Sequence, residues 1–247
     1  SLPLFIWLSA SIVALVVLSR GFRAGANVFL WTLIPLGIGF YYTSDPTSVF
    51  LVISVFLLAL ALRNRFSWEQ VLVFASFVTL IGAFLYFNIA STVFYQLINI
   101  YNQMLSGTDG IPALEDKELV KIMIAGYSVM FYFFSIAVLS LARWCQSCLY
   151  NPSGFGSEFH SLRLPPYVSI VAVLAVFFCL VFVDRLGVWI PFVGSPLFIA
   201  ALGLVHWTFE AAKISSFWLI GFYIGLILFF QLFFPVLTGI AIIDSFF

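Results

Sequence analysis

Long apolar runs separated by short polar stretches follow one another along the whole chain, and this pattern predicts an all-α fold. The apolar segments are 3–18, 27–42, 48–62, 68–88, 119–142, 167–183, 190–209 and 216–240. Several approach or exceed the roughly 18 to 20 residues with which a helix crosses the hydrocarbon of a bilayer. The strict polar and apolar alternation of outer-membrane strands is missing. We therefore predict a polytopic transmembrane helical bundle of about eight spans, forming a single integral membrane domain over residues 1–247.

Composition strengthens the assignment to a membrane. The chain is 64% hydrophobic and 8% charged, whereas soluble domains carry about 25% charged residues. Net charge is zero and there is no acidic or basic tail, which argues against a nucleic-acid partner and a polybasic lipid anchor. The chain starts at Ser1 without a methionine and is apolar at once, so we expect that residues precede it. Residues 1–18 lack the basic region of a signal peptide and are interpreted as a retained span.

Basic side chains gather in every second loop between the predicted spans. They are Arg20, Arg23, Arg63, Arg65, Arg143, Arg163 and Lys213. The alternate loops carry Asp45, the acidic stretch 109–118 and the balanced pair Asp184 and Arg185. Because loops on the cytoplasmic side are enriched in lysine and arginine, the basic loops are predicted to be cytoplasmic.

The stretch from Trp68 to Leu105 contains no proline and one glycine, so a helix could continue beyond the bilayer on the outer side. Five uncharged polar residues recur there at spacings of three or four: Asn88, Thr92, Gln96, Asn99 and Gln103. This spacing places them on one face of an amphipathic outer helix. The face could lie in water at the interface, line a cleft that binds a polar ligand, or contact a partner protein.

The cytoplasmic loop from Tyr150 to Tyr167 is longer and more patterned than a connector needs to be. Turn-forming residues fill 151–156, and 157–164 is predicted to be a short amphipathic helix, capped by Ser157 and stopped by Pro165. The side chains with which this loop could dock a partner are Phe155, Glu158, Phe159 and Arg163. The alternative is a re-entry turn with an interfacial anchor.

Three ionisable residues, His206, Glu210 and Lys213, follow each other at helical spacing near the cytoplasmic end of the seventh segment. An ionisable group at the centre of a span costs about 2.5 to 3.5 kcal/mol on insertion scales, so such a cluster is a candidate site. Two interpretations stay open. The cluster is an interfacial ion pair, or it is a proton-coupled or ligand-binding site.

Cysteine and histidine patterns predict no metal site and no cofactor. Cys145 and Cys148 form a single C-x-x-C motif, and His160 follows, but structural zinc generally needs four ligands. Cys179 lies alone in an apolar segment. The sequence also lacks the G-x-S-x-G, H-E-x-x-H and Walker motifs of common enzymes. We therefore predict that the protein is not an enzyme.

The loop from Asn151 to Leu164, together with the near-terminal stretch 243–247, resembles the YybS-like family of uncharacterised bacterial membrane proteins. That family is distantly similar to the S components of energy-coupling-factor transporters and to the rod-shape protein MreD. The resemblance implies a location in the bacterial inner membrane. It also implies a docking patch of small residues on the first helix, which only Ala10 and Ala14 match here.

Two functions follow as hypotheses. The first is a non-enzymatic membrane subunit, S-component-like, that binds or transports a small molecule through the outer amide face and acts with a protein partner. The alternative is a membrane scaffold or assembly factor that docks partner proteins through the cytoplasmic loop 150–166. In both hypotheses the partners are the lipid bilayer and a second protein.

Overall fold

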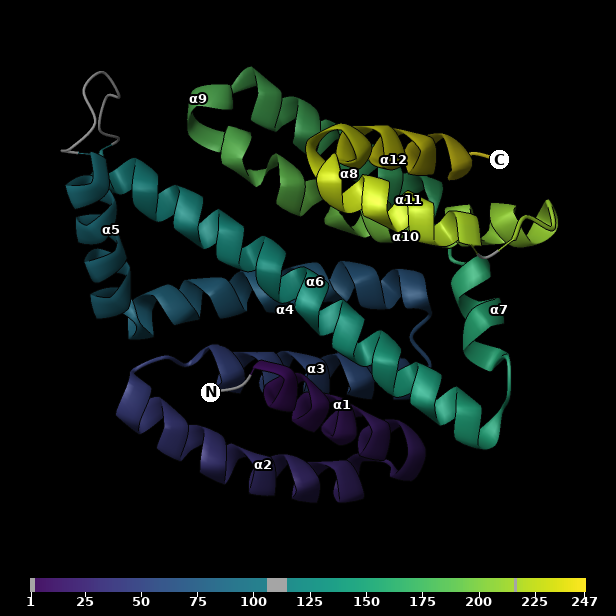
Figure 1. The fold of residues 1–247 in the computed structure, drawn as a ribbon, viewed down its shortest axis with the longest axis horizontal. Coiled ribbons are helices and arrows are strands. Elements are labelled where there is room, and N and C mark those ends of the chain that lie inside the picture. The colour runs from purple at the N-terminus through teal and green to yellow at the C-terminus, as the bar shows by residue number, and fades with distance from the viewer. Residues whose placement is uncertain (1–2, 106–114, 216) are drawn as a thin grey trace. The chain divides into compact units, whose positions relative to one another are not determined.

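The computed structural model describes residues 3–105, 115–215 and 217–247, and these residues are helical almost throughout (Figure 1). No strand occurs within these ranges. The predicted all-α class is therefore confirmed. The first six helices are α1 (Pro3–Arg20), α2 (Phe22–Thr43), α3 (Thr47–Arg63), α4 (Trp68–Ile89), α5 (Ser91–Leu105) and α6 (Asp116–Tyr150). The remainder are α7 (Gly154–His160), α8 (Pro166–Val181), α9 (Val183–Leu186), the 3-10 turn η1 (Gly187–Trp189), α10 (Ile190–Ala211), α11 (Phe217–Leu228) and α12 (Phe230–Asp244).

The chain forms two compact units, whose limits fall just before α4, inside α4 and inside α6. Unit 1 comprises the chain up to Arg65 together with Phe74–Gln146. Unit 2 comprises Phe66–Val73 and Ser147–Phe247. That the two units together form a single integral membrane domain over residues 1–247 stays a prediction.

Apolar helices of membrane-spanning length occur in both units. Those of at least 18 residues are α2, α4, α6 and the stretch Val183–Ala211, which joins α9, η1 and α10. Shorter apolar helices, 10 to 17 residues long, are Phe5–Arg20, Thr47–Arg63 and Pro166–Val181. With the bent pair α11 and α12, these described helices account for the apolar segments of the sequence, and the protein is an integral membrane protein.

Small residues bring the helices of unit 1 together. Helix α1 packs against both α2 and α3. At Gly25 of α2, an added Cβ would lie 2.3 Å from a methyl carbon of Val17 in α1, so only glycine permits this approach. Ala10 and Ala14 of α1 are both fully buried. They were predicted to form a docking patch for another protein. In the structure their surface is covered within the molecule, because small residues allow helices of the chain itself to approach closely.

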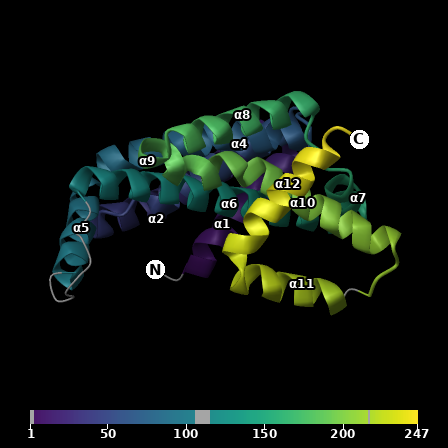
Figure 2. The same ribbon diagram turned by 90° about the horizontal axis from the view of Figure 1, so that it is seen from above.

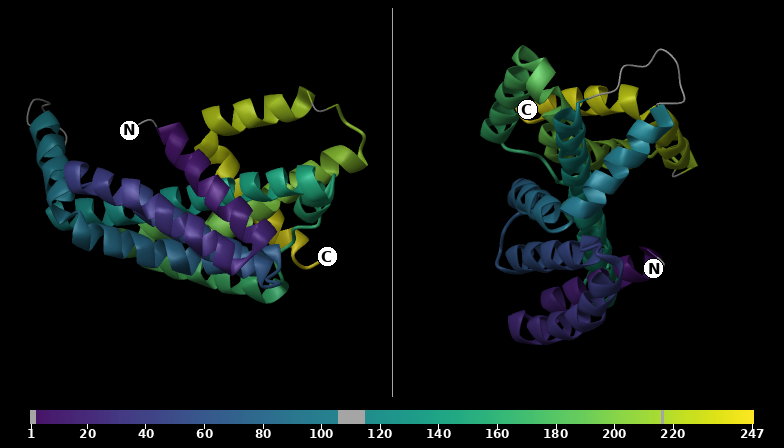
Figure 3. Two further views of the ribbon diagram at one scale, coloured as in Figure 1. Left: turned by 90° about the horizontal axis from the view of Figure 1, so that it is seen from below. Right: turned by 90° about the vertical axis from the view of Figure 1, so that its left-hand side faces the viewer.

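The last apolar segment, predicted as one span over 216–240, is not one continuous helix. It breaks at Phe229 into α11 and α12, whose axes are bent by 115°. At 1.5 Å per residue the two helices are about 18 and 22 Å long, shorter than the roughly 30 Å of hydrocarbon in a bilayer. The two arms of this hairpin diverge in the view from above (Figure 2) and again in the view from below (Figure 3).

Both ends of the α11–α12 hairpin lie at the end of unit 2 that carries α7. Helix α10, which precedes α11, contacts α7 through Glu210 and His160. Helix α12 ends at Asp244, which binds Arg163 in the linker that follows α7. The hairpin therefore begins and ends near the same end of the unit. This arrangement is expected of a re-entrant element, whereas a broken span would leave its two ends on opposite sides of the membrane.

Two shorter elements also differ from expectation. The helix predicted to run on from Trp68 to Leu105 is interrupted at Ala90, where α5 turns away from α4 (Figure 1). Helix α7 begins at Gly154 instead of Ser157. The Phe155 N–H donates to the Ser147 hydroxyl at the end of α6, at 3.2 Å. A side chain eight residues upstream thus satisfies the start of α7, and Ser157 lies inside the helix.

Candidate functional site

Helix α7 packs on α10 and on the start of α4 through its aromatic side chains. Phe159 meets the His206 ring of α10 edge-on, with centroids 5.3 Å apart. Phe155 stacks on Phe159 and contacts Trp68 of α4, in both cases at 5.9 Å. At Gly203 of α10 an added Cβ would lie 2.6 Å from the Phe159 carbonyl oxygen. The two helix backbones therefore touch, and α10 fixes the position of α7.

The loop side chains predicted to dock a partner are largely engaged within unit 2. The Trp68 indole N–H donates to the Glu158 carboxylate at 3.0 Å. Phe155, Glu158 and Phe159 are all partly buried. Only Arg163 keeps about half of its side chain exposed, at 48%. The structure thus places three of the four predicted docking residues in internal packing, and partner docking stays a prediction.

Arg163 and Asp244 form a two-pronged ion pair between the α7–α8 linker and the end of α12. The guanidinium donates from Nε to Oδ2 at 2.9 Å and from Nη2 to Oδ1 at 2.8 Å. Paired charge-assisted bonds of this geometry are among the stronger polar contacts in proteins. They fasten the C-terminal end of the hairpin to the linker.

A buried hydroxyl pair lies next to this ion pair in the sequence. The Ser245 hydroxyl donates to the Ala241 carbonyl oxygen at 2.8 Å, so Ser169 must be the donor in the 2.6 Å bond between Ser169 and Ser245. Both serines are buried. This bond joins the first turn of α8 to the end of α12.

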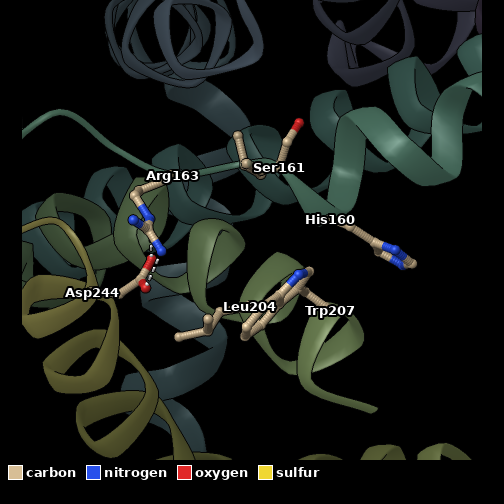
Figure 4. A pocket seen from close by; sticks show the side chains of 7 residues that line it. His160, Ser161, Arg163, Leu204, Trp207 and Asp244 are labelled. Carbon is tan, nitrogen blue, oxygen red and sulfur yellow. Dashed lines mark hydrogen bonds and ion pairs between the residues drawn. The ribbon is translucent and has the colours of Figure 1, made fainter. Parts of the chain in front are cut away.

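A cavity of about 350 Å³ opens beside the Arg163–Asp244 pair (Figure 4). Its lining residues are His160, Ser161, Leu162, Arg163, Leu204, Trp207 and Asp244. In Figure 4, Arg163 and Asp244 point toward each other, and Leu204 and Trp207 of α10 lie to the right of this pair. The cavity thus combines a charged wall, made by the linker and α12, with an apolar floor, made by α10.

The two histidines of the chain lie together next to this cavity. His160 of α7 contacts the Glu210 carboxylate of α10 through Nδ1. Nε2 of His206 in α10 forms a 2.7 Å hydrogen bond with the hydroxyl of Tyr223 in α11. Their ring centroids are 6.2 Å apart. Three helices that are separate in the sequence therefore bring four ionisable side chains into one cluster.

The predicted cluster of His206, Glu210 and Lys213 is changed by this arrangement. His206 and Glu210 do share the C-terminal part of α10, but their partners are Tyr223 and His160. Helix α10 ends at Ala211, and Lys213 has a φ of +52° in the following turn. Lys213 therefore leaves the helical face on which we expected it, because the left-handed residue redirects the backbone.

The predicted amide face is exposed and is divided by the bend at Ala90. Asn88 ends α4 and donates its amide N–H to the Phe84 carbonyl at 2.7 Å. Gln96, Asn99 and Gln103 lie exposed on α5. The Thr92 side chain and the acidic residue Asp109 lie outside the described residues. A ligand-binding role for this face stays a prediction.

Cysteines and metal-ligand groups show no further site in the described ranges. Cys145, Cys148 and Cys179 are free thiols. No group of three or more His, Cys, Asp and Glu side chains among the described residues could hold a metal ion.

Sequence reasoning missed Asp244, Tyr223 and His160 as members of one site. Asp244 is the only charged residue after Lys213, at the end of an apolar segment, and that isolation was a usable signal. No sequence signal indicated that His160 and Tyr223 contact α10, because α7, α10 and α11 are separate helices.

Comparison of the chain with models of protein families, with curated proteins and with solved structures found no match. The resemblance to the YybS-like family therefore stays a prediction.

Proposed function

We propose that this integral membrane protein is a non-enzymatic binding subunit, of the kind that serves transport, and that it holds a molecule with an acidic group in the cavity beside Arg163. The acidic group is a phosphate or a carboxylate, carried either by a membrane lipid or by a small solute. The observation that carries the proposal is the half-exposed Arg163 guanidinium in the wall of a 350 Å³ cavity.

The chemistry of arginine supports an acidic ligand. A guanidinium has five N–H groups, and the two bonds to Asp244 use two of them. The N–H groups that remain can bind the oxygens of a second acid, which is the geometry for which arginine is suited. Trp207 and Leu204 offer an apolar surface for the rest of the ligand. An amphiphile could place its acidic head at the charged wall and its apolar part on the apolar floor.

The position of the cavity supports access from the side of the basic loops. Arg163 belongs to the set of basic loop residues predicted to be cytoplasmic. Pockets with basic side chains on this side of membrane proteins are suited to acidic lipid headgroups. We therefore place the proposed binding site at the cytoplasmic leaflet, instead of on the outer amide face.

Thermal unfolding in an uncharged detergent tests this function with two soluble probes, dihexanoyl phosphatidylglycerol and inorganic phosphate. A probe at ten times its Kd stabilises the folded protein by about 1.4 kcal/mol. Arg163→Gln should weaken binding by roughly tenfold to a hundredfold, since a hydrogen bond to a charged group contributes about 1.5 to 3 kcal/mol. Asp244→Asn should retain or tighten binding, because it removes the carboxylate that competes for the guanidinium.

The matched control is Arg185→Gln, which removes an exposed arginine from α9 at the other end of α8. It should leave probe-dependent stabilisation unchanged. If Arg163→Gln and Asp244→Asn both lower stability and neither alters the response to the probes, the pair is only a structural clamp and the proposed function is wrong. Stabilisation by the lipid but not by phosphate identifies a lipid ligand, and stabilisation by both identifies the acidic group as sufficient.

A further inference from the structure

The histidine cluster beside the cavity carries an inference beyond ligand binding. Its geometry is set by three separate contacts: His160 with Glu210, His206 with Tyr223, and the edge of Phe159 against the His206 ring. Glu210 is mostly exposed, at 69% of its side chain, so the His160 end of the cluster lies at the surface of unit 2. His206 and Tyr223 are each partly buried. The cluster therefore has an exposed end, at Glu210, and a partly buried end, at His206 and Tyr223.

Other ionisable groups on the surrounding elements are few and nearly balanced. They are Glu158 on α7, Glu69 on α4, Lys213 after α10, Arg163 in the linker and Asp244 on α12. Glu158 accepts a bond from Trp68, and Arg163 is paired with Asp244. Among the described contacts, Glu210 is the carboxylate bound directly to a histidine. One carboxylate thus contacts the His160 ring, and the His206 ring lies next to His160, with centroids 6.2 Å apart.

We propose that His160 and His206 share one proton, and that this proton links ligand binding in the cavity to proton uptake. The proton site stands on the geometry above. The link to a ligand rests on the proposed function, because it requires an acid at Arg163.

A single proton satisfies this arrangement better than two. A proton taken from water onto His160 makes an imidazolium in contact with the Glu210 carboxylate, and no other bond changes. A second proton on His206 would place two positive charges about 6 Å apart beside a single carboxylate. The Tyr223 hydroxyl tolerates either location of the proton, since it can donate to a neutral Nε2 or accept from a protonated one.

Ligand binding and protonation are coupled through the shared cavity wall. His160 lines the cavity together with Arg163, so an acid bound there favours the positive form of His160. Coupling between two binding events is reciprocal, and proton uptake must then strengthen acid binding by the same factor. The cavity would take up its ligand together with a proton.

The proton site can be tested without any ligand, because the chain has only two histidines. Ring-15N histidine is incorporated, and the imidazolium fraction of each ring is measured by NMR between about pH 8 and 5, where histidine changes charge. His160→Gln and His206→Gln assign the two signals. We expect the imidazolium fractions of the two rings in the wild type to add up to about one at the lowest pH. In each variant, the imidazolium fraction of the remaining ring should also reach about one. A wild-type sum near two, or near zero, overturns the shared proton.

The link to the ligand is tested by calorimetric titration with dihexanoyl phosphatidylglycerol in two buffers of different ionisation heat. We expect the wild type to take up as much as one proton for each probe bound, and His160→Gln to bind without proton uptake. Binding by the wild type with no proton uptake overturns the link while leaving the proposed function intact. Absence of binding overturns the proposed function and the link together, whereas the histidine count stands independently of both.

Discussion

At Gly203 the backbone of α10 lies against the carbonyl oxygen of Phe159, and this contact positions α7 over the histidine cluster. An added Cβ would lie 2.6 Å from that oxygen, which belongs to the backbone and cannot rotate away. At Gly221 of α11, by contrast, nothing lies within 4 Å of an added Cβ. The same substitution should thus have opposite consequences at the two glycines.

Gly203→Ala is expected to lower the free energy of unfolding by about 1 to 3 kcal/mol, the usual cost of overpacking a filled interior. The measurement is denaturant or thermal unfolding in detergent. Gly221→Ala is the control and should be neutral or slightly stabilising, since alanine favours helix over glycine. Equal effects of the two substitutions would show that α7 does not lie against α10 as described.

Some single-residue roles were predictable and others were not. His206 and Glu210 stood out because ionisable residues are rare in apolar segments. Ala10 and Ala14 were recognised as a contact for a helix, but a sequence cannot say whether that helix belongs to the same chain. Lys213 was placed on a helical face because spacing was extended past the end of α10, and only the backbone conformation shows where the helix stops.

At the scale of elements, the α11–α12 hairpin shows that an apolar run can contain a break that its length does not reveal. Residues 216–240 are long enough for one span, and the break at Phe229 contains neither proline nor glycine. After the break, α12 packs on α10. Phe198 stacks on Phe234 at 5.2 Å, and an added Cβ at Gly194 would lie 2.9 Å from the Phe234 ring.

Cysteine labelling tests the path of this hairpin in the full-length protein, with the three native cysteines replaced by serine. Single cysteines are introduced by Ser215→Cys, Phe247→Cys and Asp184→Cys, all at exposed positions. In intact cells, a membrane-impermeant maleimide should either label both Ser215→Cys and Phe247→Cys or label neither. Asp184→Cys, at the other end of α8, should behave in the opposite way. Opposite labelling of positions 215 and 247 would mean that the segment crosses the membrane after all.

Helix α7 illustrates the second limit at this scale. An amphipathic helix in the 150–166 loop was predictable from its pattern. Its start at Gly154 was not, because the Phe155 N–H is satisfied by the Ser147 hydroxyl, and a bond between elements leaves no mark on local periodicity.

At the scale of the whole molecule, apolar side chains dominate the exposed surface. Trp31, Tyr41, Phe77 and Ile227 are each more than 60% exposed. A water-soluble protein rarely exposes contiguous apolar patches above a few hundred Å². Lipid is the solvent in which this surface is stable.

The protein should accordingly stay with the membrane fraction after washes with high salt and with alkaline carbonate, which release peripheral proteins, and detergent should extract it. The measurement is the distribution between pellet and supernatant after ultracentrifugation. Release by carbonate would contradict an integral membrane location.

Composition and periodicity by themselves determined the all-α class, the membrane location and the approximate limits of most helices. These properties are decided by hydrophobicity and backbone hydrogen bonding within each segment, both of which are local. Tertiary structure alone decided that the last segment folds back, that Ala10 and Ala14 are covered from within, and that His160, Arg163 and Asp244 meet at one cavity. Those outcomes depend on which helices contact each other. The spacing of apolar and polar residues within one segment does not determine which distant segment it contacts.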